Sequence, residues 1–187
     1  YEKQIVRPVT AIRFYPLTRK TLEGVLPVML ERTVVRDGRR ALVVAGSSDR
    51  VEKLNAHLWN YNDRVFLPHG SKADGFPTRQ PVWLTDADEN PNDARVLFLA
   101  DGATSAHVGD FDLVCELFDG RDDTAVTAAR SRWKAYKDGG HALTYWQQTE
   151  RGGWAQKAEG EGRALRHIGL CRTTYRRRGH ATSYALV

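Results

Sequence analysis

Short apolar runs that alternate with amphipathic segments are the feature that most constrains the fold of this chain. Residues 41–45 (A-L-V-V-A) and 96–100 (V-L-F-L-A) contain no charged side chain, which is typical of strands buried on both faces of a parallel sheet. Strands are predicted at 11–15, 41–45, 82–85, 96–100 and 113–118, and helices begin at Thr18 or Thr21, at Ser47 or Ser48, and at Asp122. This order predicts a three-layer α/β/α sandwich around a mostly parallel, mixed sheet, which is Rossmann-like in outline.

The boundaries of the folded part follow from composition. We expect the first helix to run to about Arg36, the second to close near Trp59 and the third to end at Gly139-Gly140. Residues 60–81 are rich in Gly, Pro and Asp and predict a long ordered loop, and 144–146 predict a last short edge element. We therefore expect an N-terminal extension at 1–10, one α/β domain at 11–157 and a basic, disordered tail at 158–187.

The positive charge of the chain belongs to that tail. The net charge is +5, but residues 151–187 contain eight basic and two acidic side chains, which leaves 20 basic and 21 acidic ones elsewhere. A domain that binds duplex DNA should carry a basic face, so we expect the body to contact nucleic acid mostly indirectly.

The sequence contains no run of about 20 apolar residues, so we expect no membrane span. With two cysteines and no secretory signal at residues 1–4, we expect a reducing, cytoplasmic compartment.

The chain lacks the motifs of nucleotide-binding and catalytic α/β proteins. The first strand is followed by P-L-T-R-K, without the glycines that let a backbone approach a pyrophosphate. His107 with Asp110 and Asp112 is interpreted as a solvated loop, His69 as a residue that orders its loop by hydrogen bonding, and Cys115 as a small core residue. His167 and Cys171 are four residues apart, with no second pair to complete a zinc site. We expect no catalytic residue, no metal and no cofactor.

The third predicted helix carries a candidate binding face made of basic and apolar side chains. Helical spacing places Val126, Arg130, Trp133, Lys134 and Lys137 on one face and leaves Ala125, Ala128, Ala129 and Tyr136 for the packed side. Such a face suits a short peptide that ends in acidic and apolar residues: Arg130 can grip a carboxylate, the lysines can attract it and Trp133 can wall an apolar slot. The alternative is a solvated helix end whose Trp133 covers the core.

A second candidate surface combines aromatic residues from a helix end and a loop. Trp59 closes the second predicted helix, and Phe66 and Pro68 lie in the loop after it. Large aromatic side chains in such places are often interface anchors. The alternative is a satellite core beneath the loop.

In order along the chain, these motifs resemble the chi subunit family of bacterial DNA polymerase III, and most closely its alphaproteobacterial members. The resemblance runs from about Ile12 to about Trp154. It rests on I-R-F-Y, L-N-A-H-L-W, F-L-P-H-G, V-L-F-L-A-D-G, L-F-D-G-R-D, A-R-S-R-W-K-A-Y-K and T-Y-W-Q-Q. Each motif is weak alone, but the ordered set is specific.

The resemblance implies a non-catalytic accessory subunit that links the clamp-loader complex to single-stranded-DNA-binding protein during replication. In the family, the last long helix holds that protein's acidic, phenylalanine-ended C-terminal tail, at positions that correspond to Arg130, Trp133 and Lys134. A second surface, which binds the psi subunit or, exclusively of it, a helicase, corresponds to Trp59 and Phe66. Some relatives carry a basic residue where this chain has Val126, and a tyrosine where it has Trp133. The resemblance implies a monomer or a heterodimer, and the competing hypothesis is direct nucleic-acid binding through the basic tail.

Overall fold

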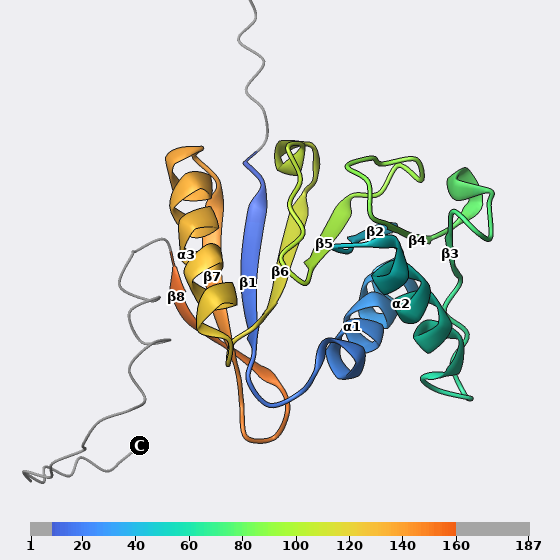
Figure 1. Ribbon diagram of the computed structural model, residues 1–187, viewed down its shortest axis with the longest axis horizontal. Helices are drawn as coiled ribbons and strands as arrows, with labels where there is room; N and C mark the ends of the chain where they lie inside the picture. The colour runs from blue at the N-terminus through green and yellow to red at the C-terminus, as the bar shows by residue number, and fades with distance from the viewer. Residues whose placement is uncertain (1–8, 160–187) are drawn as a thin grey trace, which may run out of the picture.

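The computed structural model describes residues 9–159, which form one mixed sheet covered by helices on both faces (Figure 1). The sheet has eight strands in the order β3-β4-β2-β5-β6-β1-β7-β8. Every neighbouring pair is parallel except the antiparallel pair β7–β8. The strands are β1 (Ala11–Leu17), β2 (Ala41–Val44), β3 (His69–Ser71), β4 (Val82–Thr85), β5 (Val96–Ala100), β6 (Leu113–Asp119), β7 (Ala142–Gln148) and β8 (Trp154–Glu159).

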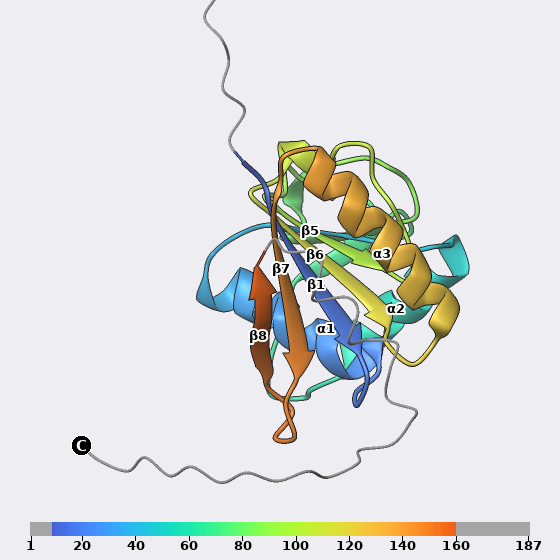
Figure 2. The same cartoon turned by 90° about the vertical axis from the view of Figure 1, so that its left-hand side faces the viewer.

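Three α-helices divide unequally between the two faces. The first two, α1 (Leu22–Glu31) and α2 (Ser48–Asn60), cover one face, and α3 (Asp123–Asp138) covers the other. Figure 2 shows α1 and α3 on opposite sides of the sheet. Adjacent residues of β1 show the division, because Tyr15 packs in the core that contains Leu26 of α1, whereas Phe14 packs in the core that contains Trp133 of α3. The predicted three-layer α/β/α sandwich is confirmed.

Helices α2 and α3 begin at polar caps. The Ser47 hydroxyl accepts a hydrogen bond from the backbone N–H of Arg50 at 3.3 Å, and the Asp122 carboxylate accepts one from Thr124 N–H at 2.9 Å. Each cap satisfies a backbone donor that the first helical turn leaves unpaired. Helix α3 ends before Gly140, whose φ of +79° suits glycine. The sequence-based start of α3 and the glycine end are confirmed.

The first helix departs from its prediction. Its regular part is only Leu22–Glu31, and residues Arg32–Arg36 continue as a π-helical turn. Pro27 lies inside α1 and has no N–H to donate to the carbonyl of Glu23 one turn earlier. That carbonyl instead accepts a hydrogen bond from Nε2 of His57 on α2, at 2.8 Å. The contact therefore ties α2 to the point where the proline interrupts the α1 hydrogen bonds.

Two strands went unpredicted, and the edge assigned to residues 144–146 is wrong. The unpredicted strands are β3, which lies within the predicted loop at 60–81, and β8. Residues 144–146 belong to β7, which lies between β1 and β8, so that β8 forms this edge of the sheet. The N-terminal extension before residue 9 and the tail after residue 159 lie outside the described residues. Within residues 9–159, no helix is long and apolar enough to cross a membrane.

Candidate functional site

Three basic side chains of α3 define the first candidate site, here called the cationic face: Arg130, Lys134 and Lys137. The two lysines are exposed and Arg130 is half-buried. In residues 9–159, neither lysine forms an ion pair, so their charges are not neutralised by the domain itself. The cationic face can therefore attract a negatively charged partner.

The apolar members of the predicted face lie elsewhere. Val126 and Trp133 are only 4% and 3% exposed and face the core together with Ala129, whereas Ala128 is exposed. The prediction that Ala128 packs inward is wrong, and Trp133 does not stand beside the lysines as an open wall. Val126, Ala129 and Trp133 follow the i, i+3, i+7 spacing of a buried stripe. Burying this stripe removes an indole and a valine from water, whereas burying Ala125 and Ala128 would remove only small methyl groups.

Trp133 supports the helix from below. Its ring packs edge-on against Phe14 of β1, with 5.0 Å between ring centroids, and Phe14 in turn meets Phe118 of β6 at 6.3 Å. Aromatic pairs at these distances and angles are favourable beyond the burial of their area. The indole N–H of Trp133 has no hydrogen-bond partner in the described part of the chain. The buried position of Trp133 therefore agrees with the alternative interpretation, in which this residue covers the core.

A buried ion pair joins α3 to β6, and the sequence pattern did not indicate it. Glu116 of β6 is 1% exposed and accepts hydrogen bonds from Nε and Nη2 of Arg132 at 2.9–3.0 Å and from the hydroxyl of Tyr136 at 3.0 Å. Burial raises the pKa of Glu116 against the opposing effect of Arg132. Because Arg132 and Tyr136 both point at the sheet, they fix the rotation of α3 and leave Arg130, Lys134 and Lys137 on its other sides.

Arg130 lies over the strand next to β1. Burial raises the pKa of Tyr145 on β7 to about 12, and the nearby guanidinium of Arg130 opposes that rise. The cationic face thus runs from the exposed side of α3 down to the β7 side of the helix.

Trp59 and Phe66 form the second candidate site, here called the aromatic patch. Trp59 is 53% and Phe66 71% exposed, and their ring centroids are 6.4 Å apart. Pro68 is half-buried beside them in the sequence. The two rings therefore lie together on the surface and are not a satellite core.

His69 orders the loop beneath this patch, as predicted. It is 3% exposed, and its two ring nitrogens contact the carbonyl oxygens of Leu67 at 2.7 Å and Asn55 at 3.2 Å. The ring of Trp59 packs on His69 with 4.6 Å between centroids. His69 therefore joins the loop to α2 at the place where Trp59 projects.

The other candidates form no site. His107 lies 3.8 Å from Asp110 and 3.9 Å from Asp88 on an exposed loop, and within residues 9–159 no three His, Cys, Asp or Glu side chains are grouped to hold a metal ion. Cys115 is buried, as predicted, and burial raises the pKa of its thiol to about 12. A thiol with so high a pKa is a poor nucleophile. His167 and Cys171 lie outside the described residues.

Residues 9–159 thus combine a layered α/β fold with a basic face on α3 and an exposed aromatic pair at the end of α2. A family model described as "DNA polymerase III chi subunit, HolC" matches residues 9–144. The chain therefore belongs to the DNA polymerase III chi subunit family, whose members are accessory subunits of a replicative polymerase. This confirms the resemblance stated from its motifs.

A curated relative agrees with the family model. Over 60 residues, the chain is 40% identical to the probable DNA polymerase III subunit chi of Rickettsia prowazekii (strain Madrid E). The matched stretch covers 32% of this chain and 36% of the relative, or about a third of each.

Proposed function

We propose that this chain is a non-catalytic accessory subunit of the DNA polymerase III holoenzyme that docks the acidic C-terminal tail of single-stranded-DNA-binding protein. The docking site is the cationic face of α3, and docking links that protein to the clamp-loader complex. The observation that carries the proposal is that one helix carries Arg130 and two exposed lysines, and that these lysines form no ion pair within residues 9–159.

The charge pattern of the site supports a negatively charged chain end as the ligand. A guanidinium can bind a carboxylate through two parallel hydrogen bonds, which gives Arg130 the geometric part of the recognition. Lys134 and Lys137 are exposed and supply attraction that acts over roughly a Debye length, about 8 Å at physiological salt. Binding should therefore weaken as salt is added.

The buried stripe of α3 supports the same function indirectly. Trp133 packs on Phe14, and Arg132 is bound to Glu116, so the helix is held by the sheet along its inner side. A rigidly held helix loses little conformational freedom when a peptide binds. In this arrangement Trp133 positions the cationic face, and the peptide contacts the side chains above it.

Titration of an acidic C-terminal peptide, with and without its final phenylalanine, tests the proposal. We expect a dissociation constant in the micromolar range, which corresponds to a binding free energy of about −8 kcal/mol. The peptide without the phenylalanine should bind more weakly. Lys134→Ala should weaken binding, whereas Lys53→Ala should not, because Lys53 is also exposed but lies on α2 on the opposite face. Equal effects of the two substitutions would reject the assignment to α3.

The aromatic patch is the proposed contact for the second partner, which is the psi subunit or, exclusively of it, a helicase. The exposure of Trp59 and Phe66 supports this, since paired large aromatic rings on a surface are typical interface anchors. We expect Phe66→Ala to weaken binding of the psi subunit while leaving tail-peptide binding unchanged.

The competing hypothesis is direct nucleic-acid binding by the basic tail. It rests on the eight basic and two acidic residues of 151–187. Single-stranded oligonucleotide should be titrated against the full chain and against a chain that ends at Ala158. Tight, steeply salt-dependent binding by the shortened chain would favour a nucleic-acid-binding body over an adaptor.

A further inference from the structure

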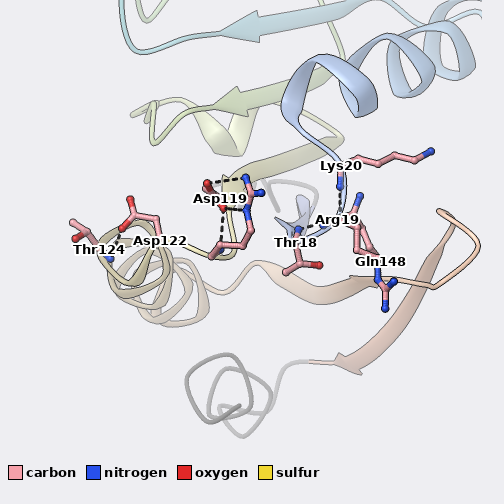
Figure 3. A network of polar contacts seen from close by, with 8 residues as sticks. Thr18, Arg19, Lys20, Asp119, Asp122, Thr124 and Gln148 are labelled. Atoms are coloured by element: carbon pink, nitrogen blue, oxygen red, sulfur yellow. Dashed lines mark hydrogen bonds and ion pairs between the residues drawn. The ribbon is translucent and has the colours of Figure 1, made fainter. Parts of the chain in front are cut away.

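The carboxyl ends of β1 and β6 meet at a point where the chain leaves the sheet in opposite directions. The two strands are parallel neighbours, and β1 leads to α1 on one face while β6 leads to α3 on the other. In open α/β sheets, ligands bind in the crevice that such a switch creates. Figure 3 shows the polar contacts of this region, with residues from the turn after β1, the end of β6, the start of α3 and the end of β7.

Three successive backbone donors converge on one acceptor in this crevice. The N–H groups of Thr18, Arg19 and Lys20 donate to Oε1 of Gln148 at 3.0, 2.8 and 3.3 Å (Figure 3). Consecutive N–H groups that point at one position form a concave nest that favours an anion. The nest lies just before α1, whose ten residues add the positive end of a helix dipole.

Only one of the two polar atoms of the Gln148 amide is satisfied in the nest. Gln148 is 5% exposed, and its Nε2 is buried without a hydrogen-bond partner in residues 9–159. An unpaired buried donor is unfavourable, because the amide gave up its contact with water and gained none in return. A group that offers only acceptor oxygens would fill the nest without that loss. The nest therefore has the chemistry of an oxyanion site.

The charges around the nest agree with this. Arg19 and Lys20 form no ion pair in the described part of the chain. On the β6 side, the carboxylate of Asp119 is bound by Arg121 through Nε at 3.0 Å and Nη2 at 3.2 Å. An anion placed at Oε1 of Gln148 would thus meet three amide donors. The residues that supply two of these donors carry basic side chains without an ion pair in residues 9–159, and the carboxylate of Asp119 is already neutralised.

The turns on both sides of residues 18–20 are closely packed. A Cβ at Gly120 would lie 2.8 Å from Cγ2 of Thr18 and 2.9 Å from Cβ of Pro16, so the β6 side fits closely against the β1 turn. On the other side, a Cβ at Gly152 in the β7–β8 turn would lie 3.0 Å from Nζ of Lys20. The hairpin β7–β8, which carries Gln148, therefore closes the site.

We propose that the nest of Thr18, Arg19 and Lys20 is an oxyanion site of the phosphate class that the chain fills with its own Gln148. The site is closed while the hairpin β7–β8 is docked, and it binds phosphate when the Gln148 side chain is withdrawn. This inference is independent of the cationic face of α3.

Phosphate titration of three proteins tests the proposal: the full chain, Gln148→Ala and the control Gln147→Ala. Gln147 is the exposed neighbour of Gln148 on the same strand. The amide resonances of Thr18, Arg19 and Lys20 would be followed as inorganic phosphate replaces chloride at constant ionic strength. We expect Gln148→Ala to bind phosphate about tenfold more tightly than the other two, with shifts at these three amides. A folded Gln148→Ala whose three amides do not shift, or equal binding by all three proteins, would overturn the proposal.

A second variant decides the matter if Gln148→Ala does not fold. Gln148→Glu keeps the side-chain length and places a carboxylate oxygen in the nest. At pH 7 we expect its Tm to exceed that of the unsubstituted chain by about 2–4 °C. This gain should vanish as the pH falls below about 4.3, where a glutamate is protonated. A lower Tm at pH 7 would show that the nest does not favour an anion.

Discussion

Arg132 of α3 and Glu116 of β6 are joined by two guanidinium nitrogens and both carboxylate oxygens, at 2.9–3.0 Å, inside the domain. Glu116 is 1% and the Arg132 side chain 13% exposed, so the carboxylate is almost wholly removed from water. The pair therefore connects the helix that carries the cationic face to the middle of the sheet.

Removing one member of this pair should cost far more than removing an exposed pair. We expect Arg132→Met to lower the free energy of unfolding by about 3–5 kcal/mol, because it leaves the carboxylate of Glu116 buried and unpaired. The control is Arg121→Met, which breaks the exposed pair with Asp119 and should cost about 0–1 kcal/mol. Denaturant unfolding measures both. Similar losses in the two variants would mean that the buried pair does not hold α3.

The buried carboxylate should also affect the pH dependence of stability. Because burial raises the pKa of Glu116 in the folded state, the folded protein binds this proton more tightly than the unfolded chain, whose glutamates titrate near pH 4.3, roughly. The contribution of Glu116 to stability is thus largest in acid and declines as the pH rises from that value through the raised pKa. Relative to Glu116→Gln, the unsubstituted chain should lose stability over this range. A difference that instead grows with pH would show that Arg132 lowers this pKa.

Arg130→Ala should weaken binding of the acidic tail peptide by about 1.5–3 kcal/mol, the range for a hydrogen bond to a charged group. Arg130 is the half-buried guanidinium of the cationic face and is near enough to Tyr145 of β7 to affect its pKa. Calorimetric titration at two salt concentrations measures the loss. Unchanged affinity in a folded variant would move the proposed site away from Arg130.

Trp133→Phe should act on stability and not on peptide binding. The indole is 3% exposed and packs on Phe14, so a smaller ring loses core contacts. The cost should stay below the roughly 3–5 kcal/mol expected when a buried tryptophan is truncated to alanine. Thermal unfolding and peptide titration would be measured on the same sample. A large loss of affinity with little loss of stability would place Trp133 in direct contact with the peptide.

Phe66→Ala should be nearly silent in stability, within about 0.5 kcal/mol, because the ring is 71% exposed. Phe118→Ala provides the contrast, since Phe118 is 2% exposed and its truncation should cost about 3–5 kcal/mol. Denaturant midpoints measure both. A costly Phe66→Ala would mean that the ring stabilises its loop.

The layered fold was readable from sequence where local signals agree. The strands at 41–45 and 96–100 are apolar throughout, and the capped start and glycine end of α3 are both written in the chain. β3 has only three residues, two of them polar, and lies in a stretch rich in Gly and Pro, so no periodicity marks it. The π-helical turn at Arg32–Arg36 has no sequence signal of comparable strength.

For the candidate sites, the sequence indicated which residue types are present better than it indicated which way their side chains face. Residue types and spacing identified Arg130, Lys134 and Lys137, but a helical face drawn from spacing alone did not say which side turns inward. That choice depends on the partners in the sheet, namely Phe14 for Trp133 and Glu116 for Arg132. Glu116 lies in an otherwise apolar strand, and its ion pair spans 16 residues. The nest around Gln148 spans about 130 residues and leaves no local trace.

The aromatic patch begins on α2 and the cationic face lies on α3, and the sheet separates these helices. Under the proposed function, the tail peptide and the second partner would therefore approach the domain from opposite faces of the sheet, and we expect both to bind at once. The domain would then act as a rigid spacer that keeps two otherwise independent molecules within a few nanometres of each other. Their encounter would depend on that enforced proximity, in the manner of a bivalent linker, and would require no conformational signal through the sheet.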